Sequence, residues 1–310
     1  MIRAIELRKS YGNLAAVDGI SFEVQRGEIL GFLGPNGAGK STTMRMLTGY
    51  IEPSSGQAMV AGFDLATEPK AAKRKIGYLP ESAASYPAMT VLEYLHFCAE
   101  LRGIVEPARQ AAVQAAMEKT QLFSAANKTI ATLSKGYRQR VGFAQALVHD
   151  PPVLILDEPT DGLDPNQKHE VRQLIRQMAQ DKAILLSTHI LEEAEAVCDR
   201  VLVIHRGRIC ASGTPAELLT RSSLYQAVEF RPLRPLSEAE QAQLKGLEGA
   251  KELVISEQPG LWRLLPQPGA NLLSAVTRLL SELGQGPEEI YLLKGRMDEV
   301  FRNLTAQEAP

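Results

Sequence analysis

A glycine-rich stretch at residues 34–42 carries the residue types that bind phosphate groups. It reads Gly-Pro-Asn-Gly-Ala-Gly-Lys-Ser-Thr, between an apolar run at 28–33 and a helix-like stretch at 43–48. Strand, glycine-rich loop and helix in this order predict a phosphate-binding loop. Glycines permit positive φ angles, which lets backbone N–H groups reach phosphate oxygens at the positive end of a helix. The alternative is a glycine-rich turn before an ordinary helix, but all four defining positions and both flanks match the motif.

Each residue of this loop has an expected role. Lys40 is expected to reach the β- and γ-phosphates of a nucleotide, and Ser41 to place its hydroxyl on Mg²⁺. The predicted nucleotide contacts in this stretch are Gly34, Asn36, Gly37, Ala38, Gly39, Lys40, Ser41 and Thr42.

Two carboxylates and a histidine follow apolar strands further along the chain. Residues 153–156 form a continuous apolar run, typical of a buried parallel strand, and Asp157 and Glu158 come at its C-terminal end, where α/β sheets place ligands. Asp157 suits a Mg²⁺ ligand, directly or through water, and Glu158 can polarise an attacking water. His189 follows a second apolar run at 183–186 and can hydrogen-bond a γ-phosphate oxygen, although a single histidine is more often structural.

Bulk properties place the chain among ordinary globular proteins. It has 310 residues, 45% hydrophobic and 23% charged, and a net charge of −2, which gives no indication of nucleic acid binding. Its apolar runs are far shorter than the ~20 residues that span a bilayer. The N-terminus carries charges in place of a signal peptide's apolar centre, so we expect a cytoplasmic protein. The three cysteines are widely spaced, which predicts buried thiols in a reducing compartment and no metal site.

Strands and helices alternate through most of the chain and predict an α/β fold. Helical spacing at 90–102 and 107–120 indicates a helical subdomain inserted into an α/β core, and another helix is expected at 138–148, opened by Ser134 and Gly136. Strands are expected at 2–7, 20–24, 57–62, 76–79, 153–156 and 183–186, and a hairpin at 199–212. Residues 1–222 are expected to form one nucleotide-binding domain, and 223–310 a small α+β domain whose charges at 237–240 form a solvated face.

The motifs in this order resemble the nucleotide-binding subunits of ABC transporters. The matching pieces are the loop at 34–42 (Walker A), Leu-Ser-Lys-Gly-Tyr at 133–137 (the signature), the strand and acidic pair at 153–159 (Walker B), Asp-Gly-Leu-Asp at 161–164, and His189. The resemblance covers about residues 1–222. Within the family, the chain is similar to exporter-type subunits of the gliding-motility and multidrug subfamily. It implies a P-loop NTPase core of ABC type with an N-terminal antiparallel β subdomain, a helical subdomain at about 84–150 and a small C-terminal α+β domain.

The resemblance also implies an ATPase that works as a head-to-tail homodimer. Two ATP molecules with Mg²⁺ would lie at the interface, each held by Walker A of one copy and by Ser134 and Gly136 of the other. Tyr11 falls where the family stacks an aromatic ring on adenine; from the sequence alone it could equally be a packing residue. The residues that the resemblance assigns to catalysis are Glu158 and His189, and those that it assigns to the metal are Ser41, Glu81 and Asp157.

Two positions depart from the family pattern. Glu81 stands where glutamine is common; it can still bind Mg²⁺, but it cannot donate a hydrogen bond to water when ionised. Lys135 and Tyr137 replace glycine and glutamine of the usual signature, while Ser134 and Gly136 match it. We therefore expect the nucleotide site to work, with the contacts made by these residues changed in detail.

The expected partner is an integral membrane permease on a separate chain. A coupling helix of that permease would dock near residues 81–101, which would hold this protein on the inner face of the cell membrane and drive transport, most simply export. The alternative is a soluble ABC-type ATPase that acts on ribosomes or DNA. Such proteins usually pair two domains in one chain or insert a long coiled coil, whereas this chain has one phosphate-binding loop and no heptad stretch.

Overall fold

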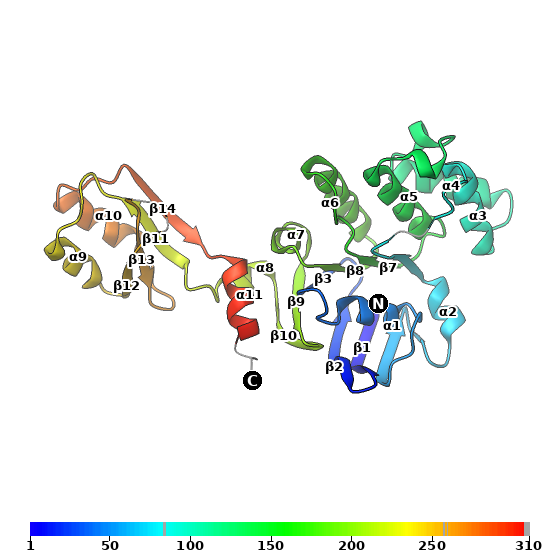
Figure 1. Ribbon diagram of the computed structural model, residues 1–310, viewed down its shortest axis with the longest axis horizontal. Coiled ribbons are helices and arrows are strands. Elements are labelled where there is room, and N and C mark those ends of the chain that lie inside the picture. Colours follow the sequence, from blue (N-terminus) through cyan, green and yellow to red (C-terminus); the bar gives the residue numbers. More distant parts are fainter. Residues whose placement is uncertain (83–84, 257, 259, 307–310) are drawn as a thin grey trace. The chain divides into compact units, whose positions relative to one another are not determined.

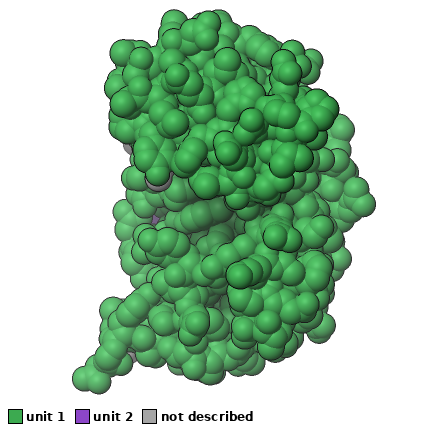
Figure 2. Space-filling model, turned by 90° about the vertical axis from the view of Figure 1, so that its right-hand side faces the viewer, with its two compact units in different colours: residues 1–214 green, residues 215–310 purple. Residues whose placement is uncertain are grey.

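The computed structural model describes residues 1–82, 85–256, 258 and 260–306. The chain forms two compact units, residues 1–214 (unit 1) and 215–310 (unit 2), drawn in Figure 1. Figure 2 shows one face of unit 1, which is hollowed between an upper and a lower part. Residue 84, where the expected helical subdomain begins, and residues 307–310, which end the expected C-terminal domain, lie outside the described residues.

The first sheet of unit 1 is antiparallel, with strand order β2-β1-β4-β5. It confirms the expected N-terminal antiparallel subdomain. Both strands of its first hairpin are longer than predicted, because Tyr11 pairs with Leu14 and carries the ladder up to the turn through several register shifts. The strand bounds are β1 Ile2–Tyr11, β2 Leu14–Val24, β4 Ser55–Val60 and β5 Phe63–Asp64.

The second sheet of unit 1 brings the functional loops together. Its order is β10-β9-β3-β8-β7-β6; all neighbours are parallel except the β9–β10 hairpin. Leu33 lies beside Thr188, and Asp157 beside Ser187, so the loops after β3, β7 and β8 leave the same edge of the sheet. The bounds are β3 Ile29–Leu33, β6 Ile76–Leu79, β7 Val153–Asp157, β8 Ala183–Thr188, β9 Arg200–His205 and β10 Arg208–Gly213.

One hydrophobic core joins the two sheets of unit 1. Phe22 of β2 and Phe32 of β3 meet edge to face with ring centroids 4.9 Å apart, a favoured aromatic geometry. Met44 and Leu47 of α1 are fully buried in the same core. Helix α1 is thereby fixed against both sheets. The helices that cover the sheets of unit 1 are α1 Lys40–Leu47, α2 Pro69–Arg74, α6 Pro165–Ala179 and α7 Leu191–Val197.

Three further helices of unit 1 pack around a core of their own, as the spacing of their apolar residues predicts. They are α3 Val91–Leu101, α4 Ala108–Lys119 and α5 Lys135–Leu147, with 3-10 turns at Phe123–Ala125 and Ile130–Thr132. Thr90 caps α3 in a capping box with Glu93. The predicted start of α5 at residue 138 is wrong. Ser134 is its N-cap, because its side chain accepts the Tyr137 N–H, and so Gly136 lies in the first turn.

Unit 2 is a four-stranded antiparallel sheet with helices, an α+β arrangement. Its strand order is β12-β13-β11-β14, and α9 and α10 contribute apolar residues to the core on one face of the sheet. The bounds are α8 Pro215–Leu219, β11 Tyr225–Arg231, α9 Glu238–Lys245, β12 Ala250–Ile255, β13 Trp262–Pro266, α10 Leu273–Glu282, β14 Glu289–Lys294 and α11 Met297–Ala306.

The expected solvated face at residues 237–240 is wrong for one of its charges. Glu240 is only 6% exposed. It closes a capping box with Ser237 and forms an ion pair with Arg234 at 2.9 Å. The sequence contains no signal for this burial, because Arg234 precedes the helix and Gln285, which donates a hydrogen bond to Glu240, lies 45 residues further along the chain.

In the described parts of the chain, no helix is both long and apolar enough to cross a membrane.

Candidate active site

The loop between β3 and α1 forms a cradle of backbone donors. Gly39 is the N-cap of α1 with φ 104°, a conformation that L side chains rarely adopt. A Cβ at this position would lie 2.5 Å from the Ala16 carbonyl, and one at Gly34 only 2.4 Å from the Ile204 carbonyl. Only glycine therefore fits at these two points, and the loop is held with its N–H groups at the positive end of α1.

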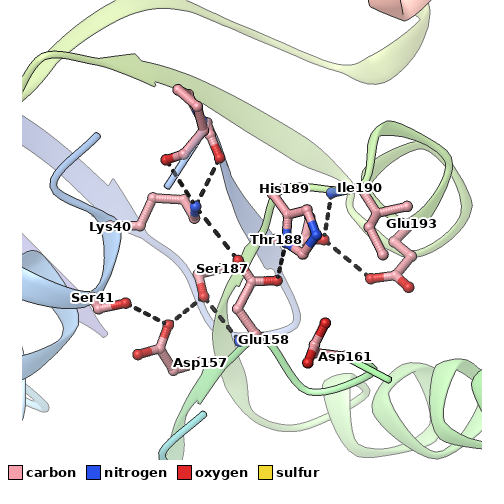
Figure 3. Close-up of polar contacts among 12 residues, drawn as sticks. Lys40, Ser41, Asp157, Glu158, Asp161, Ser187, Thr188, His189, Ile190 and Glu193 are labelled. Atoms are coloured by element: carbon pink, nitrogen blue, oxygen red, sulfur yellow. Dashed lines mark hydrogen bonds and ion pairs between the residues drawn. The ribbon is translucent and has the colours of Figure 1, made fainter. Parts of the chain in front are cut away.

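Lys40 lies buried at the floor of this cradle. Its ammonium group donates to the carbonyls of Gly34 at 2.7 Å and Pro35 at 3.2 Å, and it lies 3.4 Å from the Glu158 carboxylate (Figure 3). The Lys40 side chain is 5% exposed. Its charge is thus compensated within the protein and fixed at the point where a phosphate group would enter.

Asp157 connects the cradle to the end of β7 and β8. Its Oδ1 accepts a hydrogen bond from the Ser41 hydroxyl at 3.2 Å and one from the Ser187 hydroxyl at 2.5 Å (Figure 3). Together, burial and this carboxylate raise the pKa of Tyr78 on β6 to about 12. Asp157 is itself 2% exposed, so its carboxylate is held in place beside the Ser41 hydroxyl.

Glu158 is held by three groups from different elements. Its backbone has φ 48°, a left-handed conformation that is uncommon for this residue type, and its N–H donates to Ser187 Oγ at 3.0 Å. One carboxylate oxygen faces Lys40, and the other lies 3.0 Å from Nδ1 of His189 (Figure 3). With Nδ1 protonated, His189 donates to this carboxylate. The predicted base and the predicted γ-phosphate sensor are therefore in direct contact.

A buried carboxylate anchors the turn that carries His189. Thr188 Oγ1 donates to Glu193 of α7 at 3.0 Å and accepts the Ile190 N–H at 3.0 Å. Glu193 in turn forms an ion pair with Lys168 of α6 at 3.0 Å. Helix α6 begins at its N-cap Asp164, so the Asp-Gly-Leu-Asp loop and the histidine turn are tied through these side chains.

A cavity of about 530 Å³ collects most of the predicted residues in one place. Gly34, Ala38 and Asp157 are the predicted cradle and strand-end residues that do not line it. Two predicted side chains stand at its rim: Tyr11 is 51% exposed, and Glu81 is also exposed. The predicted residues that line the cavity are Tyr11, Asn36, Gly37, Gly39, Lys40, Ser41, Thr42, Glu81, Glu158 and His189.

Ser134 and Gly136 do not line this cavity. They lie at the N-terminus of α5, where Ser134 is exposed and Gly136 is buried. Lys135 between them points back to the same chain's Asp161 at 3.5 Å. The signature therefore forms a separate group of backbone donors, and its lysine lies beside the loop that precedes α6.

Ser187 is a site residue to which the sequence assigned no role. It bridges the two acidic residues, since it donates to Asp157 and accepts from the Glu158 backbone. A signal did exist, because two apolar parallel strands that both end in polar residues must bring those residues together. The register that pairs Asp157 with Ser187 was not predictable from the strands alone.

The residues present fit a Mg²⁺ ion bound with a nucleotide. No group of three or more His, Cys, Asp or Glu residues suited to a metal occurs in the described portion of the chain. Mg²⁺ needs no such group, since it usually keeps several waters and takes one or two protein oxygens with the phosphates of its ligand. The adjoining oxygens of Ser41 and Asp157 are donors of this kind.

The chain is similar in sequence to known transporter subunits. The family model described as "ABC transporter" matches residues 17–161. The linearmycin resistance ATP-binding protein LnrL of Bacillus subtilis is 31% identical over 311 residues, which cover 99% of both chains. The probable multidrug ABC transporter ATP-binding protein YbhF of Escherichia coli is 40% identical over 224 residues, 72% of this chain; the chain spans only 39% of that relative's length.

The fold is similar to that of solved structures as well. A structure described as the ATP-binding subunit of an ABC transporter superposes with a TM-score of 0.64 at 33% identity and covers 70% of this chain and 91% of its own. The covered share of this chain is close to the share taken up by residues 1–222, the part that carries the motifs.

Proposed function

Because this chain belongs to the family of ABC transporter ATP-binding proteins, we propose that it binds and hydrolyses ATP to drive transport by a separate membrane permease. A single observation carries the proposal: one cavity combines the glycine cradle and Lys40 with the Glu158–His189 pair. A phosphate cradle alone suits any nucleotide-binding protein. A buried carboxylate and a histidine at its mouth are what hydrolysis requires in addition.

The cradle is suited to the phosphates of ATP. Backbone N–H groups at the start of α1 and the Lys40 ammonium would hold the β- and γ-phosphates, and the exposed ring of Tyr11 would stack on adenine. Ser41 and Asp157 would hold Mg²⁺, with Glu81 at the rim as a further ligand; the ion would supply positive charge at the β- and γ-phosphates.

Glu158 is the proposed general base. Its carboxylate is fixed between Lys40 and His189, so one oxygen can accept a proton from a water that attacks the γ-phosphate. His189 would orient the carboxylate and donate to the γ-phosphate. The preorganised carboxylate needs little rearrangement once Lys40 turns to the phosphate.

The complete site is proposed to form between two copies of the chain. The donors around Ser134 and Gly136 lie outside the cavity of their own copy, and the N-terminus of α5 suits an anion. They would complete the site of a second copy, so that each ATP is shared by Walker A of one copy and the signature of the other. Asp164, which caps α6, would lie near this interface.

The membrane partner and the transported substrate are part of the same proposal. The helical subdomain at about 84–150 would receive the permease, which would hold the protein at the inner face of the cell membrane. Residues 1–222 would form the ATPase domain and 223–310 an accessory domain. Export is favoured by the relatives, since YbhF is named as a multidrug transporter protein and LnrL as a resistance protein.

Co-purification from the native host tests the coupling to a permease. The chain, extracted in mild detergent, is expected to bring down a polytopic membrane protein and to hydrolyse ATP in that complex. ATP hydrolysis without any membrane partner, together with association with ribosomes or DNA, would support the alternative soluble ATPase instead.

A further inference from the structure

Asp161 is an acidic residue of the nucleotide cavity that the proposed mechanism does not use. It lines the cavity, and its N–H donates to the carbonyl of the proposed base Glu158 at 3.1 Å (Figure 3). Among the described residues that line this cavity, Glu81, Glu158 and Asp161 are acidic, and Lys40 is the one lysine or arginine. Lys40 is already paired with Glu158. A nucleotide brings further negative charge, so an uncompensated carboxylate at Asp161 would oppose its binding.

Lys135 of the signature supplies the compensating charge from outside the cavity. Its ammonium group lies 3.5 Å from Oδ2 of Asp161, and Lys135 is not among the residues that line the cavity. Gly162 leaves the room that the lysine needs, because a Cβ at this position would collide with the Lys135 ammonium group. The lysine side chain therefore lies against the backbone of the loop that carries Asp161.

The first two turns of α5 pack closely on the segment around this ion pair. Gln139 is only 8% exposed, and its amide donates to the Pro159 carbonyl at 2.8 Å. Gly136 lies so near Gln167 of α6 that a Cβ there would be 2.7 Å from the Gln167 side chain. These two contacts lie on either side of Asp161 in the sequence. Packing thus places the lysine at the loop, and the half-exposed ion pair itself need contribute little to stability.

We propose that Lys135 is a positioning residue for Asp161, and that the pair sets how tightly this copy's own cavity binds a Mg-nucleotide. Lys135 holds the Asp161 carboxylate at the edge of the cavity and compensates its charge. Without the lysine, the carboxylate is able to turn towards the cavity and repels the phosphates. The inference rests on the proposed function, since it concerns the same nucleotide site, and it gives Lys135 a role within its own copy.

Calorimetric titration of the dilute full chain with Mg-ADP tests the proposal. Mg-ADP is the probe because, without a γ-phosphate to hydrolyse, the measured affinity is not mixed with turnover. Lys135→Gln is expected to raise the dissociation constant by about three- to tenfold at an ionic strength of about 0.05 M. At about 0.5 M the difference should shrink to less than about twofold, since both side chains are half exposed and salt screens them.

A double-mutant cycle shows whether Lys135 acts through Asp161. Asp161→Asn should bind Mg-ADP at least as tightly as wild type, and Lys135→Gln in the Asp161→Asn background should change the affinity by less than about twofold. Lys135→Arg keeps the charge and should bind as wild type does. Lys128→Gln is the matched control for net charge, because it removes an exposed lysine that precedes α5 and does not line the cavity.

Three results would overturn the proposal. They are a Lys135→Gln chain that binds Mg-ADP as tightly as wild type, the same loss of affinity with and without Asp161, and an equal loss in Lys128→Gln. A wild-type chain that binds no Mg-ADP would instead contradict the proposed function, so the two failures are distinguishable.

Discussion

Lys40 and Glu158 form a buried ion pair, with 3.4 Å between Nζ and Oε1, and both side chains are less than a tenth exposed. The lysine is the proposed phosphate ligand and the glutamate the proposed base. Each neutralises the other's charge while no phosphate is bound, and breaking such a pair leaves a buried charge without a partner. In the proposed mechanism, arrival of a γ-phosphate would give Lys40 a new partner and would free Glu158 for a water molecule.

Replacement of Glu158 by Gln is expected to stop turnover without weakening ATP binding. The amide cannot accept the proton of the attacking water, so hydrolysis should fall by roughly 10²- to 10⁴-fold. It also removes the charge that competes with phosphate for Lys40, so ATP should bind at least as tightly and hold the copies in a long-lived dimer. Phosphate release and size-exclusion chromatography with Mg-ATP measure the two effects. Unchanged hydrolysis would remove Glu158 from the role of base.

Replacement of Ser187 by Ala should lower kcat while leaving the KM for ATP nearly unchanged. The Glu158 N–H loses its acceptor and Asp157 loses a donor, so the two carboxylates are less firmly placed; the expected loss in kcat is about tenfold. Ser187→Thr retains the hydroxyl and is the rescue control. Equal loss in both variants, or a rise in KM alone, would assign Ser187 to packing and not to positioning.

The stability of unit 2 is expected to depend on the ionised Glu240. The Ser237 backbone N–H and the Arg234 guanidinium lower the pKa of Glu240 to about 2. Its folded pKa is below that of the unfolded chain, so the stabilisation is complete above about pH 4.3 and disappears as the pH falls towards 2. Glu240→Gln should therefore destabilise unit 2 at neutral pH, and wild type and variant should converge in acid.

The single tryptophan makes the stability of unit 2 measurable. Trp262 packs against the core of unit 2, so its fluorescence reports denaturant unfolding of that unit. Glu238→Gln, on the exposed side of the same first turn, is the matched control and should behave as wild type. A difference between Glu240→Gln and wild type that persists at pH 2 would contradict the role given to the charge.

The buried His149 is expected to make the stability of unit 1 depend on pH as well. Burial lowers the pKa of His149 to about 4; Arg102 and Lys182 act in the same direction, and the hydrogen bond to Ile76 and the charge of Asp150 act against them. Its Nε2 donates to the Ile76 carbonyl, while Nδ1 is buried without a partner. Between pH 6.5 and 4 the unfolded chain binds the proton and the folded chain does not. Unit 1 should therefore lose stability as the pH falls through this window, by at most about 3 kcal/mol.

His149→Gln keeps the donor to Ile76 but cannot titrate. Amide hydrogen exchange in β6 and β7 at pH 7 and pH 4.5 measures local stability in both proteins. The variant should lose less protection on acidification than wild type. An identical loss in both would mean that other groups cause the acid response.

The sequence predicted the parts of the site that depend on local patterns. Glycines before Lys40, and acidic residues after an apolar run, are local signals with a direct physical meaning, and Glu158 and His189 lie together as strand ends in a parallel sheet must. The α/β core and the N-terminal antiparallel sheet followed from the same patterns. The capping box at Thr90 and Glu93 is a local signal of the same kind, since a threonine cap needs only residues of its own helix.

What the sequence could not predict depends on register and on distant partners. Ser187 acquires its role only when β8 pairs with β7 in one register, and the burial of Glu240 requires Arg234 and Gln285 from other segments. The contact of Lys135 with Asp161 likewise joins segments that are 26 residues apart in the sequence. The ends of strands were not predicted where apolar and polar residues stop alternating, as in β1 beyond Leu7.

The central claim is that each ATP site is shared between two copies, and a mixing experiment tests it directly. Lys40→Ala removes the cradle's charge and Ser134→Arg blocks the signature, so each variant alone should be inactive. A mixed dimer contains one complete site, built from the cradle of the Ser134→Arg chain and the signature of the Lys40→Ala chain. Phosphate release by the equimolar mixture should therefore recover to about a quarter of the wild-type rate, because half of the dimers are mixed and each has one intact site. A mixture as inactive as its two components would contradict the shared site.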